Sequence, residues 1–217
     1  MNADTFNRLH ALRMENDAAR FAQMDMKPRF DRLAGRHENG TAPRAVSAFQ
    51  LFQTPPEIAA RLVSAVGNLA GLRVLEPSAG LGRILDAIAN AGNRPASVVA
   101  VEMAPNLAAE LYRQDRAGVV LMQGDFLERT RGELGEFDAV IMNPPFHLRA
   151  DIKHILHARE FLKPGGTLAA ICMDTPHRET ALRPLVDASG GIWETLPAGT
   201  FRAEGTQVGT ILLTLKG

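Results

Sequence analysis

Short, almost uninterrupted apolar runs recur along the chain from residue 72 onward. Five of them have the length and the Val, Ile and Ala content of buried strands: 72–76, 97–102, 119–122, 137–142 and 167–173. Helical patterns lie between most of these runs, at 83–91, 105–116 and 149–162. Strands that are apolar on both faces and alternate with helices are typical of a parallel sheet covered by helices, the α/β class.

The pattern changes toward the C-terminus. Residues 191–196 and 207–215 form two strand-like runs with no helical pattern between them, which predicts an antiparallel hairpin at the sheet edge. The chain is therefore expected to form a Rossmann-like α/β fold, with a mostly parallel seven-stranded sheet, a C-terminal antiparallel hairpin and helices on both faces. Such a sheet binds ligands at the carboxyl ends of its strands.

The N-terminal part has a different pattern. Apolar side chains recur at near-helical spacing among charges until Pro28, and Gly, Asn and Pro around residues 35–43 indicate a linker. These features predict a helical extension at 1–46 and a main domain at 47–217. The extension is interpreted first as a helix packed across the main domain and second as a substrate-binding arm.

Composition excludes several classes of protein. The 24 Lys and Arg residues balance the 24 Asp and Glu residues, so any nucleic-acid contact must come from a local patch. The single cysteine, Cys172, permits no internal disulfide, which suits a reducing compartment. No apolar run approaches the roughly 20 residues of a membrane span, and the N-terminus lacks the apolar stretch of a signal peptide. We therefore expect a cytoplasmic location.

The first candidate binding element follows the first predicted strand. Two glycines, Gly80 and Gly82, let the chain turn tightly and come close to a ligand. A dinucleotide fingerprint would need a third glycine where Leu85 stands. The acidic Glu76 suits a ligand with an amino group and a positive sulfonium better than a pyrophosphate.

Acidic residues also end the next two predicted strands. Glu102 comes 20 residues after Gly82, and a carboxylate there can accept hydrogen bonds from both ribose hydroxyls of a nucleoside. Asp125 and Phe126 follow the third strand. The Asp125 carboxylate could accept a hydrogen bond from an adenine amine, and the Phe126 ring could pack on the adenine.

The strongest local motif ends the fourth predicted strand. It reads Asn143-Pro144-Pro145-Phe146, and its two prolines fix the direction of the backbone carbonyls. A planar exocyclic amine is a poor nucleophile because its lone pair is delocalised into the ring. The Asn143 side-chain oxygen and the Pro144 carbonyl can accept both amine hydrogens and free that lone pair to attack a methyl group. The Phe146 ring would offer a face for stacking of the substrate.

Together these motifs resemble the S-adenosylmethionine-dependent methyltransferases that act on exocyclic or amide nitrogens. The resemblance is greatest to the phage and plasmid DNA adenine-N6 enzymes with an Asn-Pro-Pro-Phe or Asn-Pro-Pro-Tyr motif, and it covers roughly 47–216. It implies the class I methyltransferase fold and S-adenosylmethionine as cofactor. In such enzymes the glycine turn holds the methionine part, the acid after the second strand binds ribose, and the Asp-Phe pair contacts adenine. The corresponding residues here are Glu76, Ser78, Gly80, Gly82, Glu102, Asp125 and Phe126.

Members with this motif order also carry Phe-x-Thr-Pro ahead of the glycine turn, where it closes over the methionine end. Phe52 and Thr54 occupy those positions here. The same stretch fits a helix start with Thr54 as N-cap, Pro55 at N1 and Glu57 at N3. Both interpretations can hold together.

The resemblance implies methyl transfer to adenine N6 in DNA, with the target base flipped into the cleft. Sequence-specific DNA enzymes usually carry a separate recognition region, and no segment here is long enough to be one. RNA methylation at adenine N6 or guanine N2 therefore stays open, as do methylation of a protein glutamine and a non-catalytic cofactor-binding subunit.

A locally basic segment follows the motif and would suit either phosphate contacts or a solvated helix face. It contains His147, Arg149, Lys153, His154, His157 and Arg159. No metal is expected there, because these histidines lack acidic or thiol partners at ligand spacing.

Overall fold

The computed structural model describes residues 53–204 and 206–217. The predicted N-terminal extension at 1–46 and the candidate residue Phe52 lie outside the described residues. Within the described ranges, no helix combines the length and the apolar character needed to cross a bilayer.

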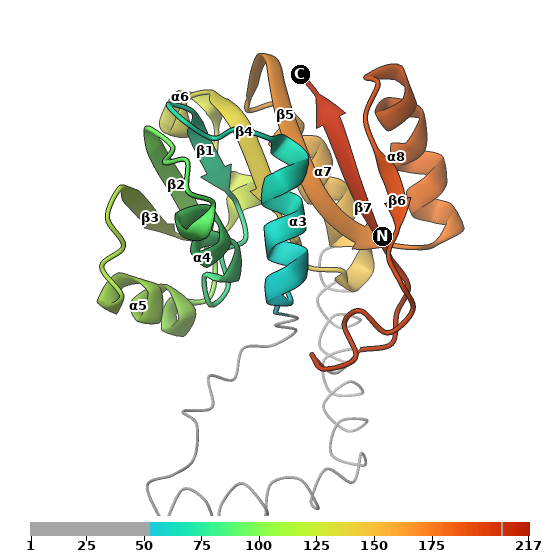
Figure 1. The fold of residues 1–217 in the computed structure, drawn as a ribbon, viewed down its shortest axis with the longest axis horizontal. Coiled ribbons are helices and arrows are strands. Elements are labelled where there is room, and N and C mark those ends of the chain that lie inside the picture. Colours follow the sequence, from blue (N-terminus) through green and yellow to red (C-terminus); the bar gives the residue numbers. More distant parts are fainter. Residues whose placement is uncertain (1–52, 205) are drawn as a thin grey trace, which may run out of the picture. The chain divides into compact units, whose positions relative to one another are not determined.

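A seven-stranded sheet forms the centre of the domain, in the order β3-β2-β1-β4-β5-β7-β6 (Figure 1). The first five strands run parallel, and β7 pairs antiparallel with both β5 and β6. The predicted mostly parallel sheet with an antiparallel C-terminal pair at its edge is therefore confirmed. The strands are β1 (Arg73–Glu76), β2 (Ser97–Glu102), β3 (Val119–Gln123), β4 (Phe137–Met142), β5 (Leu162–Met173), β6 (Trp193–Thr195) and β7 (Thr210–Lys216).

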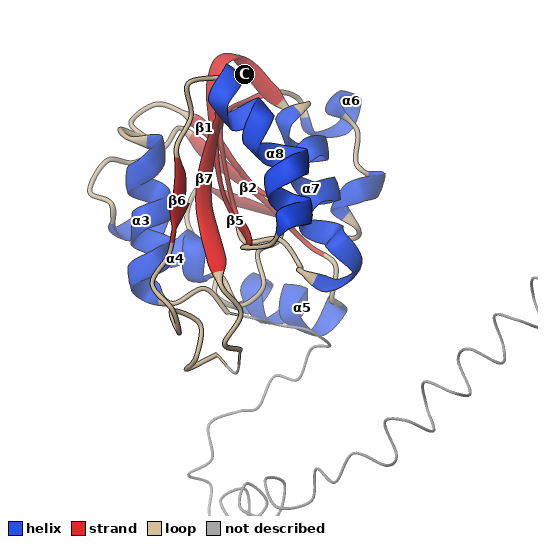
Figure 2. Cartoon of the chain, turned by 90° about the vertical axis from the view of Figure 1, so that its right-hand side faces the viewer, coloured by secondary structure: helices blue, strands red, loops and turns tan. Residues whose placement is uncertain are grey.

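Helices cover both faces of the sheet (Figure 2). One face packs against α3 and α4, and the opposite face packs against α7 and α8, so that the sheet separates two apolar cores. Central positions such as Val74 and Val140 are fully buried, which is why the strands are apolar throughout. The helices are α3 (Pro56–Val66), α4 (Arg83–Asn90), α5 (Pro105–Arg113), α6 (Arg131–Leu134), α7 (Ala150–Arg159) and α8 (Pro176–Ala188), with 3-10 turns η1 (Phe126–Glu128) and η2 (His147–Arg149).

Some boundaries differ from the sequence pattern. β5 begins five residues before the predicted start at 167, and its register against β4 shifts between Phe137 and Ala139. The two glycines Gly165 and Gly166 lie in this added part, where an apolar pattern gives no signal. The pattern also gave no helix at α8, which is rich in polar residues and contains Pro184 in its interior.

Candidate active site

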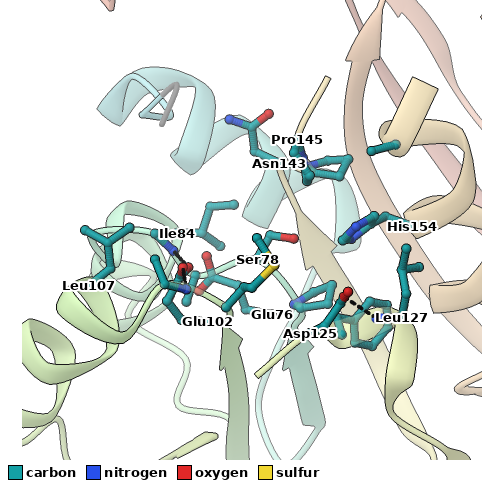
Figure 3. A pocket seen from close by; sticks show the side chains of 18 of the residues that line it. Glu76, Ser78, Ile84, Glu102, Leu107, Asp125, Leu127, Asn143, Pro145 and His154 are labelled. Carbon is teal, nitrogen blue, oxygen red and sulfur yellow. Dashed lines mark hydrogen bonds between the residues drawn. The ribbon is translucent and has the colours of Figure 1, made fainter. Parts of the chain in front are cut away.

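A cavity of about 400 Å³ opens where β1, β2, β3 and β4 end at their carboxyl edge. Its volume lies in the range of about 300–1,000 Å³ that is usual for small-molecule sites. Figure 3 shows Asn143 and Pro145 on one side of the cavity, with Glu76, Glu102 and Asp125 on the other. The expected site residues in its wall are Thr54, Glu76, Ser78, Gly80, Glu102, Asp125, Phe126, Asn143, Pro144 and Pro145. Gly82 and Phe146 do not line it.

The turn after β1 depends on its glycines. Gly80 and Gly82 both have positive φ angles, +56° and +83°. Gly82 is the N-cap of α4, and a Cβ added there would lie 2.8 Å from Leu111 Cδ2 and 2.9 Å from Arg116 Nη2. Although Gly82 is outside the cavity wall, it fixes the path of the turn that forms the wall.

Glu102 connects the loops that follow β1 and β2. Its Oε2 accepts a hydrogen bond from the Gly80 N–H at 2.7 Å, and its Oε1 accepts one from the Ala104 N–H at 2.7 Å. Burial raises the pKa of this carboxyl, and the backbone hydrogen bonds, led by that of Ala104, counteract the rise. Each carboxylate oxygen has a further lone pair for a ligand hydroxyl.

Glu76 is almost completely buried at the cavity wall, with 1% of its surface exposed. Burial raises its pKa well above the usual value, the positive charge of Arg116 opposes this rise, and the charge of Glu102 adds to it. Among residues 53–204 and 206–217, no hydrogen-bond partner reaches Glu76 Oε2 or Ser78 Oγ. A ligand with a positively charged group and N–H donors would satisfy both atoms.

Asp125 begins the turn η1 by accepting a hydrogen bond from the Leu127 N–H at 2.9 Å. The Phe126 ring lies in the core, because only 2% of this residue is exposed and its ring centroid lies 4.9 Å from His157 and 5.4 Å from Phe161. Phe126 thus has little ring surface left for stacking on a ligand, contrary to the sequence interpretation.

Beside the strand-end acids, two exposed apolar side chains that the sequence analysis missed also line the cavity. Met103 is 64% exposed and Leu127 is 37% exposed. They are suited to contact the faces of a planar ligand, because each has free apolar surface beside a strand-end acid. Their positions in the sequence could have identified them, because Met103 follows Glu102 directly and Leu127 comes two residues after Asp125.

The Asn143 side chain is oriented by a residue distant in sequence. Its Nδ2 donates a hydrogen bond to Thr54 Oγ1 at 3.1 Å. The alternative role of Thr54 as a helix N-cap is wrong, because α3 begins at Pro56 with Pro55 as its N-cap and no side-chain capping bond. With its amide nitrogen directed to Thr54, Asn143 can direct its oxygen to a different partner.

The Phe146 ring points into the core on the other side of the motif. The residue is 8% exposed, and its ring contacts that of Phe201 edge-on at 6.5 Å. Only a small part of this ring is available for substrate stacking, which the sequence analysis had expected of it.

The basic segment after the motif divides between two environments. His147, Lys153 and His154 line the cavity. His157 packs on Phe126 and contacts the Arg129 carbonyl at 3.0 Å, so it does not belong to a solvated face. Burial lowers the pKa of His154, which favours the neutral imidazole at neutral pH.

A buried ion pair behind the motif had no signal in the sequence. Arg178 Nε and Nη2 each donate to the Asp151 carboxylate at 3.0 Å. Arg178 Nη2 also donates to the Phe146 carbonyl at 3.2 Å, and the Met173 N–H donates to Asp151 at 3.2 Å. Asp151 is fully buried and Arg178 is 6% exposed. The pair ties α7, α8 and the end of β5 to the last residue of the motif.

Comparison with protein families decides the class. The family model of the methyltransferase small domain matches residues 58–192, more than half of the chain. The chain belongs to the methyltransferase small domain family. This methyltransferase uses S-adenosylmethionine as cofactor. The cavity fits that molecule, because its sulfonium and amino group match Glu76 Oε2 and Ser78 Oγ, two buried oxygens with no partner in the part of the chain that the structure describes. Comparison with curated proteins gave no significant match.

Solved structures share the fold of this methyltransferase at low sequence identity. A protein from Listeria monocytogenes proposed to be a class I S-adenosylmethionine-dependent methyltransferase is 18% identical, with a TM-score of 0.60 over 80% of this chain and 62% of that chain. The methyltransferase subunit of a type I restriction-modification system from Streptococcus thermophilus is 21% identical, with a TM-score of 0.61 over 79% and 46%. A proposed RNA methyltransferase from Pyrococcus horikoshii is 18% identical, with a TM-score of 0.59 over 80% and 90%. The chain thus spans less than two thirds of the first two.

Proposed function

We propose that this methyltransferase transfers a methyl group to an exocyclic amino nitrogen of a nucleic-acid base, and that the base is adenine, methylated at N6 in DNA. The observation that carries the proposal is that Asn143, Pro144 and Pro145 line the same cavity as Glu76, Glu102 and Asp125. In this proposal, an amine acceptor site and a nucleoside-type cofactor site share that cavity. The catalytic domain in this proposal is residues 47–217, and residues 1–46 are a separate extension.

The cofactor residues are proposed from their positions in the wall. Glu76, Ser78 and the Gly80 turn would hold the methionine end, and Glu102 would bind the ribose hydroxyls. Asp125 would accept from the adenine amine, while Met103 and Leu127 would contact the ring faces. When bound, S-adenosylmethionine supplies a methyl group on a positive sulfur, which keeps the C–S bonding electrons when the methyl leaves.

The motif would activate the amine by the positions of its hydrogen-bond acceptors. Asn143 Oδ1 and the Pro144 carbonyl accept its two hydrogens, and this pulls the nitrogen toward a tetrahedral shape and localises its lone pair. Thr54 fixes the Asn143 amide and keeps the oxygen directed to the substrate. The nitrogen forms its bond to the methyl group and then releases one proton to solvent, so no general base is needed before attack.

RNA is the second candidate substrate. The structural neighbours include a proposed RNA methyltransferase that this chain matches over 90% of that protein's length. The same motif could act on adenine N6 or guanine N2 in RNA. Glutamine methylation of a protein and a non-catalytic role rank below these, because the described residues form no additional recognition domain and the motif lies at an open cavity.

The test uses the purified full chain with methyl-labelled S-adenosylmethionine and, separately, unmethylated duplex DNA and total RNA. Mass spectrometry of the digested nucleosides is expected to find labelled N6-methyldeoxyadenosine. Asn143→Ala should lower this rate by at least about 100-fold, the size of effect that loss of one preorganised polar contact to the reacting group produces.

The matched control is Asn90→Ala, an exposed position at the end of α4 that is outside the cavity wall. It should retain the wild-type rate. Label found only in RNA would replace DNA by RNA as substrate, and equal activity of Asn143→Ala and wild type would overturn the assigned role of the motif.

A further inference from the structure

The backbone directly after the motif is strained. Leu148 has φ and ψ of 48° and 32°, and Arg149 has 63° and 28°, so two successive side-chain-bearing residues are left-handed. This region is disfavoured for such residues because Cβ comes close to the following carbonyl oxygen. Strained residues persist only where the surrounding structure holds them, and they concentrate at functional sites.

The same segment presents an apolar side chain to solvent. Leu148 is 80% exposed, more than any other large apolar residue among those described. It lines the active-site cavity and also a second hollow of about 510 Å³ beside it. The second hollow is formed by Phe146, His147, Leu148, Arg149, Met173, Arg178, Thr206 and Val208. Leu148 therefore forms a ridge between the two cavities.

Buried polar contacts hold the chain on both sides of the Leu148 ridge. Arg178 donates to the Phe146 carbonyl just before it, and Asp151 anchors the start of α7 just after it. Both members of this ion pair are buried. The loop that presents Leu148 is thus fixed at both ends by one buried pair.

The charge around the ridge suits an anionic partner. The exposed cation in the described lining of the second hollow is Arg149, since Arg178 is paired with the buried Asp151, and no carboxylate belongs to that lining. Arg149 Nη2 lies 3.5 Å from His177 Nε2, and Lys153 lines the active-site cavity. An exposed apolar tip within a cationic surface matches a polymer with planar apolar rings and a phosphate backbone.

We propose that Leu148 is a wedge that enters the base stack of duplex DNA beside the extruded target base, while the second hollow receives the neighbouring nucleotide and Arg149 contacts its phosphate. This inference rests on the proposed function. A base inside a duplex cannot reach the motif without leaving the stack, and an apolar side chain in the gap stabilises the extruded form. A single strand needs no such help, because its bases are already unpaired.

The test compares initial methylation rates on one unmethylated DNA, used as duplex and as heat-denatured single strands, at subsaturating DNA concentration. For Leu148→Ala we expect the ratio of the duplex rate to the single-strand rate to fall about tenfold or more relative to wild type. Leu148→Phe should keep most of that ratio, because a ring also fills the gap. Leu156→Ala, an exposed leucine on α7 outside both cavities, is the matched control and should leave the ratio unchanged.

Leu148→Gly separates the wedge from folding. Glycine tolerates the left-handed backbone, so the melting temperature of this variant should be no lower than that of wild type. Its ratio of duplex rate to single-strand rate should fall as in Leu148→Ala. An unchanged ratio in Leu148→Ala, or equal losses on duplex and single strands, would overturn the wedge and leave the proposed function intact. A wild-type protein that labels neither form of DNA would overturn the DNA substrate and the wedge with it.

Discussion

At the scale of single residues, the polar side chains of the cavity are held in states suited to a cationic ligand. Glu76 and Glu102 are both buried, and the pKa of each is raised, chiefly by that burial. Hydrogen bonds from two backbone N–H groups offset part of the cost of burying the charged Glu102 carboxylate, whereas Glu76 Oε2 has no partner among the described residues. Glu76 therefore destabilises the free protein when it is charged, and a bound cation would remove that cost.

The variant Glu76→Gln tests this in the free protein. The folded pKa of Glu76 lies above the usual value of 4.5, so the folded state binds a proton more tightly than the unfolded state does. The free energy of unfolding therefore loses a contribution as the pH rises from about 4.5 through the raised pKa. Glutamine cannot ionise, so the stability of Glu76→Gln relative to wild type should increase from pH 5 to pH 8, as measured by chemical denaturation.

The same variant should bind S-adenosylmethionine at least about tenfold more weakly at pH 8, because a charge-assisted hydrogen bond is lost. Titration calorimetry measures this affinity. A relative stability that does not change with pH would show that the Glu76 carboxyl titrates as it does in the unfolded chain.

At the scale of secondary-structure elements, one buried pair joins three elements to the motif. Arg178 comes from α8 and Asp151 from α7, and their network includes the Met173 N–H at the end of β5 and the Phe146 carbonyl. Removing one member of a buried pair leaves an uncompensated charge, so only a conservative change separates positioning from folding.

Arg178→Lys keeps the charge but cannot donate to the Asp151 carboxylate and the Phe146 carbonyl in the same forked geometry. We expect kcat to fall about tenfold or more while the Kd for S-adenosylmethionine stays within about twofold, because small displacements of a reacting group are costly to the rate. The control is Arg183→Lys, an arginine on the same helix whose partner Asp187 lies on the surface. Parallel losses of kcat and cofactor affinity would assign Arg178 a purely structural role.

Most of the strands were predictable from the sequence, because each buried strand is a short run of apolar residues. The runs at 97–102 and 137–142 coincide with β2 and β4, in which the successive positions 98–101 and 139–142 are apolar and buried. The apolar pattern did not predict helix α8, because only a few of its positions are buried and most of its other residues are polar. Pro184 in its interior also argues against a helix. The helix is stabilised by packing on the sheet, where Leu182 and Val186 join the apolar core on the face covered by α7 and α8.

At the scale of the whole molecule, balanced charge predicts a particular salt dependence. Because the chain carries no net formal charge, the proposed binding to DNA would have to rely on the local cations near the cavity. Duplex affinity should therefore fall as salt rises, and Lys153→Ala should reduce the slope of log K against log salt by about one. Fluorescence anisotropy with duplex DNA measures this slope.

Lys216→Ala is the control for that measurement, since Lys216 ends β7 and bonds Thr167, whose strand position lies away from the carboxyl-end loops. Its slope should equal that of wild type. A slope that both variants leave unchanged would contradict phosphate contact by Lys153.

The sequence alone determined the α/β class, the strand-end location of the acids and the motif at the end of β4, because burial and turn chemistry are local properties of the chain. The tertiary structure decided which distant residues meet. It joined Thr54 to Asn143 across 89 positions, placed the Phe126 ring in the core, and set the Arg178–Asp151 pair behind Phe146. Such contacts depend on how helices dock on the sheet, and no local pattern encodes that docking.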